Sequence, residues 1–187
     1  MKIWAYLLAG VALCGVAVAE EDILSKMINT KMNGSWFFTP EKPKAKYIKA
    51  EVLGDHAFRV RATKGANPWD LQASSPIAGA INEGDVIMIN YYARAEEPAE
   101  GGSSLTVRIQ LASEPYTSVL ETTAKISQEW KAYCAYSVAN ATMGENKSNV
   151  SVHLATAKQV IDLGPVMVFN FGKGYNTKKL ADADCDG

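Results

Sequence analysis

The chain has 187 residues, with 19 basic and 20 acidic side chains, 48% hydrophobic residues and three cysteines. This length fits one domain with a sizeable core. The composition excludes a disordered polymer, a collagen-like repeat and a disulfide-rich miniprotein, and the near-neutral charge argues against nucleic acid as a partner.

The first segment has the pattern of a secretory signal. Lys2 precedes an apolar run from Ile3 to Val18, which ends in the small residues Ala17-Val18-Ala19. We therefore expect residues 1–19 to be a cleaved signal peptide and the mature protein to be secreted or periplasmic. A membrane span is not expected, because a spanning helix needs roughly 20 apolar residues and this run is shorter.

After the leader, short alternating runs replace helical periodicity, and clusters of Gly, Pro, Asn and Asp separate them. The predicted strands are Tyr47–Leu53, Ala57–Ala62, Trp69–Ser74, Asp85–Ala95, Leu105–Ala112, Glu129–Val138, Ser148–Ala155 and Gln159–Asn170. A short helix around Ile23–Met32 is also expected, and residues 173–187 are predicted to form a weakly ordered tail. Many strands without intervening helices predict an all-β fold, either a two-sheet β-sandwich or a jelly roll.

Two cysteines follow the leader, Cys134 and Cys185. In an oxidising compartment they could form a disulfide that ties the tail to the body of the domain. Alternatively, Cys134 is a small buried hydrophobe within a strand and Cys185 is loose in the tail. Both alternatives stay open at this point.

Alternation assigns the two faces of each predicted strand. Ile87, Ile89 and Tyr91 are expected in the core, as are Val107 and Ile109. The same count places Trp69, Trp130 and Tyr136 in the core. Trp36 is also expected there, because it begins a contiguous aromatic triplet, and such a triplet usually buries at least two of its members. The residues expected on the opposite, polar face of the strands are Asp70, Gln72, Asn90, Tyr92, Arg94, Arg108, Gln110, Tyr133 and His153.

This polar set suits sugars. Amides, carboxylates and guanidinium groups match sugar hydroxyls, and the C–H face of a pyranose stacks on an aromatic ring. We expect a carbohydrate site formed by Asp70, Gln72, Asn90, Tyr92, Arg94, Arg108 and Gln110, edged by Tyr116 in a loop. The two arginines point to an acidic glycan; alternatively, they pair with Asp70 and organise the site.

Several strings in this order are similar to family 4/9 carbohydrate-binding modules. They include Pro68-Trp69-Asp70-Leu71-Gln72, Ile81-Asn82-Glu83-Gly84-Asp85-Val86, Tyr91-Tyr92-Ala93-Arg94-Ala95 and Gln159-Val160-Ile161-Asp162-Leu163-Gly164-Pro165-Val166. The resemblance covers about Asn33 to Gly172. It implies a galactose-binding-like jelly roll, with residues 20–172 as the carbohydrate-binding domain.

The same resemblance implies that the protein binds a polysaccharide or oligosaccharide without cleaving it. Members of the family are usually attached to secreted glycoside hydrolases, so a free-standing binder or an accessory of such an enzyme is implied here. No cofactor is required. A structural calcium ion, which family members often hold, would involve Asp55 and Asp162.

Three alternatives remain beside this interpretation. A jelly-roll polysaccharide lyase would use Arg, Gln, His and Tyr on one sheet; the candidates are Tyr92, Arg94, Arg108, Gln110, Tyr133 and His153. A glycosyl hydrolase needs a carboxylate pair, whereas only Asp70 is predicted on the polar face. A third alternative is an assembly protein that uses the sandwich to contact other proteins. Binding is preferred, because the sequence motifs that surround a lyase site are absent and the resemblance is to binding modules; no nucleophile motif is present either.

Overall fold

The structure is a computed structural model that describes residues 23–29, 36–41 and 44–181. The predicted signal peptide lies outside these residues, as do Cys14, Cys185 and the last part of the predicted tail. Cys134 takes part in a disulfide. Its pairing with Cys185 stays a prediction, because Cys185 is not among the described residues.

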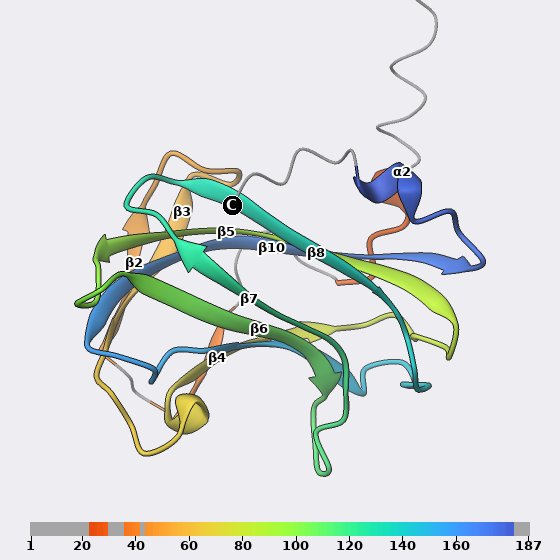
Figure 1. Cartoon of the computed structure of the whole chain (residues 1–187), viewed down its shortest axis with the longest axis horizontal. Coiled ribbons are helices and arrows are strands. Elements are labelled where there is room, and N and C mark those ends of the chain that lie inside the picture. Colours follow the sequence, from red (N-terminus) through yellow and green to blue (C-terminus); the bar gives the residue numbers. More distant parts are fainter. Residues whose placement is uncertain (1–22, 30–35, 42–43, 182–187) are drawn as a thin grey trace, which may run out of the picture.

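The described residues form two antiparallel five-stranded sheets that pack face to face (Figure 1). Sheet 1 has the order β1-β4-β9-β6-β7, and its strands are β1 (Phe37–Thr39), β4 (Gln72–Ile77), β9 (Ser148–His153), β6 (Ser103–Leu111) and β7 (Ser118–Ile126). Sheet 2 has the order β2-β3-β10-β5-β8, and its strands are β2 (Ala45–Lys49), β3 (His56–Ala62), β10 (Gln159–Lys173), β5 (Asp85–Glu97) and β8 (Lys131–Val138). The predicted two-sheet all-β sandwich is confirmed.

The core lies between the sheets and follows the predicted alternation. Ile87, Ile89 and Tyr91 of β5 are buried, and they face the likewise buried Val107 and Ile109 of β6. These side chains come from the inner faces of both sheets, so a single hydrophobic layer holds the sandwich together.

Two strands were not predicted, β1 and β7. The alternation of β7 is interrupted because Val119 and Leu120 are both buried, next to a register shift between Ile109 and Gln110 of the paired β6. Such a bulge places two consecutive residues against one on the partner strand and hides the period of two. β1 is too short, at three residues, to show a period.

The predicted faces of β8 are inverted. Tyr133 is buried and stacks on Tyr91 with ring centroids 5.4 Å apart, whereas Tyr136 is exposed. The two stacked tyrosines are directly opposed in the β5–β8 register, and opposed residues share a face. Trp130 lies before the strand begins, so its position says nothing about the alternation of β8. It is half-buried rather than part of the core, and the prediction for it was wrong.

One end of sheet 2 is covered on its outer face. Met88, Phe169 and Leu180 form a small second cluster, and Met27 packs against it. Leu180 belongs to α2 (Lys178–Ala181), a short helix within the predicted tail. A single helical turn at 23–25 stands where a longer helix was expected, and residues 30–32 lie outside the described part of the chain. No described helix has the length and apolar character needed to cross a membrane.

Candidate functional site

The outer face of sheet 1 is a continuous polar surface. Because alternate residues of β4, β6 and β9 point into the core, their neighbours project outward in three cross-strand rows. We call this surface the polar floor; it consists of Gln72, Ser74, Thr106, Arg108, Gln110, Asn149, Ser151 and His153.

Two exposed aromatic residues stand beside the polar floor. Trp69 is 55% exposed, and its ring centroid lies 6.0 Å from that of His153 in an edge arrangement. Tyr116 is 46% exposed and lies in the β6–β7 loop with a φ of 54°, a value that few bulky residues adopt. Together with part of the floor they line a cleft of about 430 Å³, which we call the aromatic cleft. Its lining is Thr39, Trp69, Gln72, Arg108, Gln110, Tyr116 and His153.

Trp69 was predicted to be buried in a strand, and that prediction was wrong. Pro68–Asp70 forms a short 3₁₀ helix before β4 begins. The sequence carried a signal for this turn, because Asn67-Pro68-Trp69-Asp70 places a capping residue, a proline and an acid at the first positions of a helical turn. The turn removes Trp69 from the alternation of β4 and leaves its ring in solvent.

Asp70 holds this turn together. Its Oδ2 accepts a hydrogen bond from the backbone N–H of Asn67 at 2.9 Å, and its Oδ1 accepts one from the Asn67 side-chain amide at 3.3 Å. The backbone hydrogen bond from Asn67 is the main cause that lowers the pKa of Asp70. Asp70 therefore positions Trp69 at the cleft, a structural role that differs from the predicted sugar contact.

The charges of the polar floor are largely balanced. Arg108 pairs with Glu121 of β7 at 2.9 Å, and its Nη2 donates to the carbonyl of Tyr116 at 3.5 Å. Burial, and then the positive charge of Arg108, lower the pKa of His153 below its ordinary value of 6.5. His153 is thus neutral at physiological pH and offers one donor and one acceptor nitrogen.

The Gln110 end of the floor has unused hydrogen-bonding capacity. Gln110 Oε1 and Asn149 Oδ1 are buried and have no hydrogen-bond partner among the described residues. The two residues are opposed in the β6–β9 register. At the other end, Gln72 Oε1 accepts from the Ser151 hydroxyl at 2.8 Å. Buried acceptors without partners are uncommon in folded proteins. Gln110 lines the aromatic cleft and Asn149 does not, and neither oxygen is itself exposed to solvent.

Three predicted site residues lie elsewhere. Asn90, Tyr92 and Arg94 project from β5 onto the outer face of sheet 2, on the other side of the sandwich. The expectation of one shared face is therefore wrong. Its cause is the chain connection after β5, which crosses from sheet 2 to β6 of sheet 1 and separates Arg94 from Arg108.

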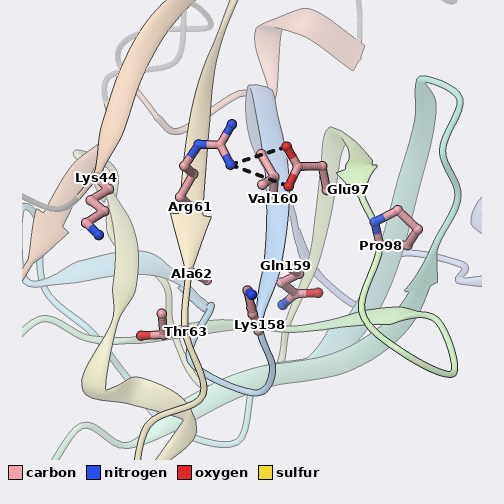
Figure 2. A pocket seen from close by; sticks show the side chains of 9 residues that line it. All are labelled: Lys44, Arg61, Ala62, Thr63, Glu97, Pro98, Lys158, Gln159 and Val160. Carbon is pink, nitrogen blue, oxygen red and sulfur yellow. Dashed lines mark hydrogen bonds and ion pairs between the residues drawn. The ribbon is translucent and has the colours of Figure 1, made fainter.

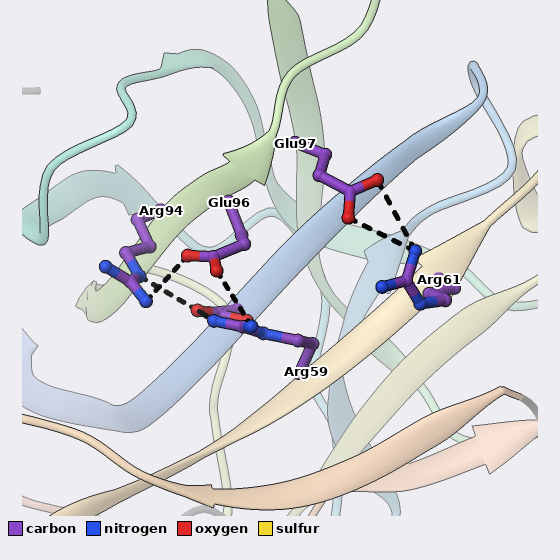
Figure 3. Close-up of polar contacts among 6 residues, drawn as sticks. Arg59, Arg61, Arg94, Glu96 and Glu97 are labelled. Carbon is purple, nitrogen blue, oxygen red and sulfur yellow. Dashed lines mark hydrogen bonds and ion pairs between the residues drawn. The ribbon is translucent and has the colours of Figure 1, made fainter.

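Arg94 belongs to a closed ionic network (Figure 3). The buried Asp162 accepts hydrogen bonds from Nε and Nη2 of Arg59 and from Nε of Arg94, each at 2.8 Å. Glu96 pairs with both arginines, also at 2.8 Å. The hydrogen bond with Asp162 is the main cause that raises the pKa of Arg59. Arg94 also lies over Trp130, with its guanidinium carbon 5.3 Å from the ring centroid, so its Nε, its Nη2 and one face of its guanidinium group are already engaged.

The residues implied for calcium do not fit that ion. Both carboxylate oxygens of Asp162 accept from guanidinium groups, and two neighbouring positive charges oppose a cation there. Asp55 is an exposed turn residue. Among the described residues, no group of three or more His, Cys, Asp or Glu side chains is arranged to hold a metal ion.

The residues proposed for a lyase are also dispersed. Tyr133 is in the core, and its hydroxyl accepts from the backbone N–H of Ser127 at 2.9 Å. Tyr92 and Arg94 lie on sheet 2, whereas Arg108, Gln110 and His153 line the aromatic cleft on sheet 1. The sandwich thus divides this set among two opposite faces and the interior.

Comparison with solved structures shows the fold. A CBM4 carbohydrate-binding module matches with a TM-score of 0.57 and 17% identity, over 72% of this chain and 94% of that chain. The N-terminal cellulose-binding domain of β-1,4-glucanase C from Cellulomonas fimi matches with a TM-score of 0.54 and 17% identity, over 76% and 94%. The CBM22-1 and GH10 modules of xylanase 10B from Clostridium thermocellum, solved with xylohexaose, match with a TM-score of 0.54 and 13% identity, over 80% and 29%.

These likenesses confirm the expected fold, the jelly-roll sandwich of carbohydrate-binding modules. No protein-family model matches the sequence, and no curated protein matches it. The fold leaves the ligand open, because function is determined by the site that a fold carries.

Proposed function

We propose that the protein binds a polysaccharide or oligosaccharide in the aromatic cleft of sheet 1. The observation that carries this proposal is the placement of two exposed rings, Trp69 and Tyr116, beside a floor of amides, hydroxyls and an imidazole. Sugar rings stack on exposed aromatic faces through their C–H groups, and their hydroxyls both donate and accept hydrogen bonds. The fold shared with carbohydrate-binding modules supports this function.

The cleft is best suited to neutral sugar units. Its one cationic side chain, Arg108, is paired with Glu121, and the pKa of His153 is lowered, so the imidazole is uncharged near neutral pH. Gln72 and Gln110 add amide groups to the lining, and amides pair with the hydroxyls of a neutral sugar. Affinity is expected to be modest, since a shallow cleft competes with water for each hydroxyl.

We further propose that the protein is secreted or periplasmic and acts as an accessory to a secreted glycoside hydrolase. The N-terminal signal pattern supports export. The xylanase with a similar fold segment joins its binding module to a GH10 module, and a separate binder could assist such an enzyme by holding the same polysaccharide.

Affinity electrophoresis with simultaneous detection of products tests the binding function. The chain without residues 1–19 is run through gels that contain soluble β-glucan, xylan, galactan, alginate or polygalacturonate, and parallel solutions are followed for the ultraviolet absorbance of unsaturated products. Two tyrosine variants make a matched pair, because Tyr116 on sheet 1 is 46% exposed and Tyr136 on sheet 2 is 43% exposed.

We expect retardation by at least one neutral polysaccharide, no unsaturated product, a clear loss of retardation for Tyr116→Ala and none for Tyr136→Ala. Equal behaviour of the two variants would overturn the location of the site. Unsaturated product from the wild-type chain would show that the protein is a lyase and not only a binding protein. The absence of retardation by every polymer would refute the proposed function.

A further inference from the structure

A second hollow lies at one end of sheet 2, where β3 and β5 end and β10 begins, and Arg61, Glu97 and Val160 line it from the outer face of the sheet (Figure 2). Its volume is about 340 Å³, a size that accepts a small-molecule ligand. The lining residues are Lys44, Arg61, Ala62, Thr63, Glu97, Pro98, Lys158, Gln159 and Val160. We call it the basic hollow. It lies on the face opposite to the aromatic cleft.

Three cations from separate segments line the basic hollow. Lys44 precedes β2, Arg61 lies on β3 and Lys158 precedes β10. The backbone N–H of Arg61 donates to the carbonyl of Lys44 at 2.9 Å, which holds those two segments side by side. Strand pairing brings the third segment next to them, because Val160 is opposed to Arg61 on one side and to Glu97 on the other. The charge cluster is a product of the fold and is not visible as a run in the sequence.

Little negative charge balances these cations. Glu97 is the one acid among the described lining residues. It pairs with Nη1 of Arg61 at 3.2 Å, and both side chains are more than half exposed. Exposed pairs of this kind are weak and open readily. Neither Lys44 nor Lys158 forms an ion pair within the described part of the chain. The hollow is therefore positive in a protein whose formal net charge is −1.

The rest of the lining matches a sugar rather than a bare ion. Thr63 provides a hydroxyl. The amide of Gln159 is buried, and its Nε2 donates to the Leu154 carbonyl at 3.4 Å and to Thr156 Oγ1 at 3.3 Å, so it closes the bottom of the hollow rather than facing a ligand. Ala62, Pro98 and Val160 add apolar surface for C–H groups. A simple oxyanion would use the cations but neither the hydroxyl of Thr63 nor the apolar wall.

We propose that the basic hollow binds an acidic sugar unit, with a carboxylate or sulfate group held by Lys44, Arg61 and Lys158. Guanidinium and ammonium groups bind such oxyanions through charge-assisted hydrogen bonds. A sugar hydroxyl is received by Thr63. This site is independent of the aromatic cleft, so the protein can hold a neutral and an acidic sugar on its two opposite faces.

Amide chemical shifts during a titration test this proposal with defined probes. Sodium glucuronate is the acidic sugar, glucose the neutral control and sodium sulfate the bare oxyanion, and the reporters are the backbone amides of Ala62, Thr63 and Val160. Lys158→Gln removes one cation of the hollow. Lys125→Gln, at an exposed position of β7 in sheet 1, removes the same charge elsewhere.

We expect saturable shifts at the three reporters with glucuronate and none with glucose. Lys158→Gln should weaken glucuronate binding by about tenfold, since one charge-assisted hydrogen bond contributes roughly that factor. Lys125→Gln and the cleft variant Tyr116→Ala should leave glucuronate binding unchanged. The polysaccharide gels therefore test the proposal for the aromatic cleft, and this titration separately tests the proposal for the basic hollow.

Three results would overturn the proposal. Glucuronate could shift the reporters no more than glucose does. Sulfate could bind as tightly as glucuronate, which would make the hollow a site for simple oxyanions. Lys125→Gln could weaken binding as much as Lys158→Gln, which would attribute the effect to the overall charge of the protein.

Discussion

The outer faces of the two sheets carry similar polar side chains, but these side chains differ in how far they are already paired with one another. On sheet 1, Gln110 and Asn149 keep unpartnered oxygens, and Trp69 exposes its ring to solvent. On sheet 2, the carboxylate of Asp162 receives three hydrogen bonds from two arginines, and Arg94 in addition covers Trp130. The first face exposes two aromatic rings beside its amides and hydroxyls, whereas the arginines of the second face are engaged by Asp162 and Glu96. An unpartnered amide oxygen alone does not separate the faces, because Asn90 Oδ1 on sheet 2 is also buried without a partner among the described residues.

This difference teaches that the residue types on a sheet face do not identify a binding site. Arginine, tyrosine and asparagine occur on both faces, and alternation alone treats them alike. A closed network satisfies its own members and contributes structure. A site is marked by groups that are held in place and remain unsatisfied. The basic hollow shows the same principle at the edge of sheet 2, since Lys44 and Lys158 lie outside the network.

The largest expected effect is on stability and concerns the network of sheet 2. Asp162→Ala should lower the free energy of unfolding by about 3–5 kcal/mol, because it leaves Arg59 and Arg94 without their buried partner. Urea unfolding measures this loss, and Glu51→Ala, which removes an exposed carboxylate, should change stability by less than about 0.5 kcal/mol. Under conditions where the variant is folded, retention by polysaccharide should persist. Lost retention with unchanged stability would place the glycan on sheet 2.

The next effect is on binding and concerns sheet 1. Trp69→Ala should weaken polysaccharide binding by about tenfold or more, since a central aromatic contact contributes roughly 1–3 kcal/mol. The stability should change little, because the ring is exposed. Tyr47→Ala removes a ring that is 59% exposed on the edge of sheet 2 and should have no effect on binding. Gel retardation across a range of polysaccharide concentrations gives both affinities, and equal losses would contradict the account.

A smaller effect concerns pH and His153. The folded protein lowers the pKa of His153 from 6.5, chiefly by burial. The unfolded chain therefore binds more protons than the folded one just below pH 6.5, and this difference makes the free energy of unfolding rise with pH. The stability that the neutral His153 contributes is fully present above pH 6.5. It falls as the pH decreases through 6.5 and levels off below the folded pKa. The urea midpoint of the wild type, relative to that of His153→Gln, should fall as the pH is lowered; a constant difference between the two midpoints would contradict this assignment.

The smallest effect concerns the exposed pair at the basic hollow. Glu97→Gln should change the free energy of unfolding by less than about 1 kcal/mol, because both partners are solvated. The same variant should strengthen glucuronate binding, since it frees Arg61 and removes a like charge from the ligand. Weaker glucuronate binding in this variant would contradict the proposed role of the three cations.

The sandwich fold and much of its core could be predicted from the sequence. Alternation correctly placed Ile87, Ile89 and Val107 inside, because the period of two is a direct consequence of strand geometry. It also correctly placed His153 on the face opposite to its buried neighbour Val152. The burial of Trp36, whose Nε1 donates to the carbonyl of Gly164 at 2.9 Å, agrees with its prediction as well.

The membership of each strand in a sheet could not be predicted in the same way. Periodicity distinguishes the two faces of a strand but carries no information on which sheet contains it, so Arg94 and Arg108 were placed together although the chain changes sheets between them. Contacts between distant segments, such as Arg59 with Asp162, leave no local pattern at all, and neither does the position of Lys44 and Lys158 around one hollow. Only the exposed position of Trp69 had a local signal, the capping pattern around Pro68.

The most direct test of the central claim is a map of the backbone amides that respond to a bound oligosaccharide. The probe is an oligosaccharide of the neutral polymer that retards the protein most strongly, titrated until the amide chemical shifts reach saturation. Our account predicts shifts confined to β4, β6 and β9 and to Trp69 and Tyr116, while Tyr92 and Arg94 stay unchanged. Shifts centred on Tyr92, Arg94 and Trp130 would contradict it and move the binding face to sheet 2.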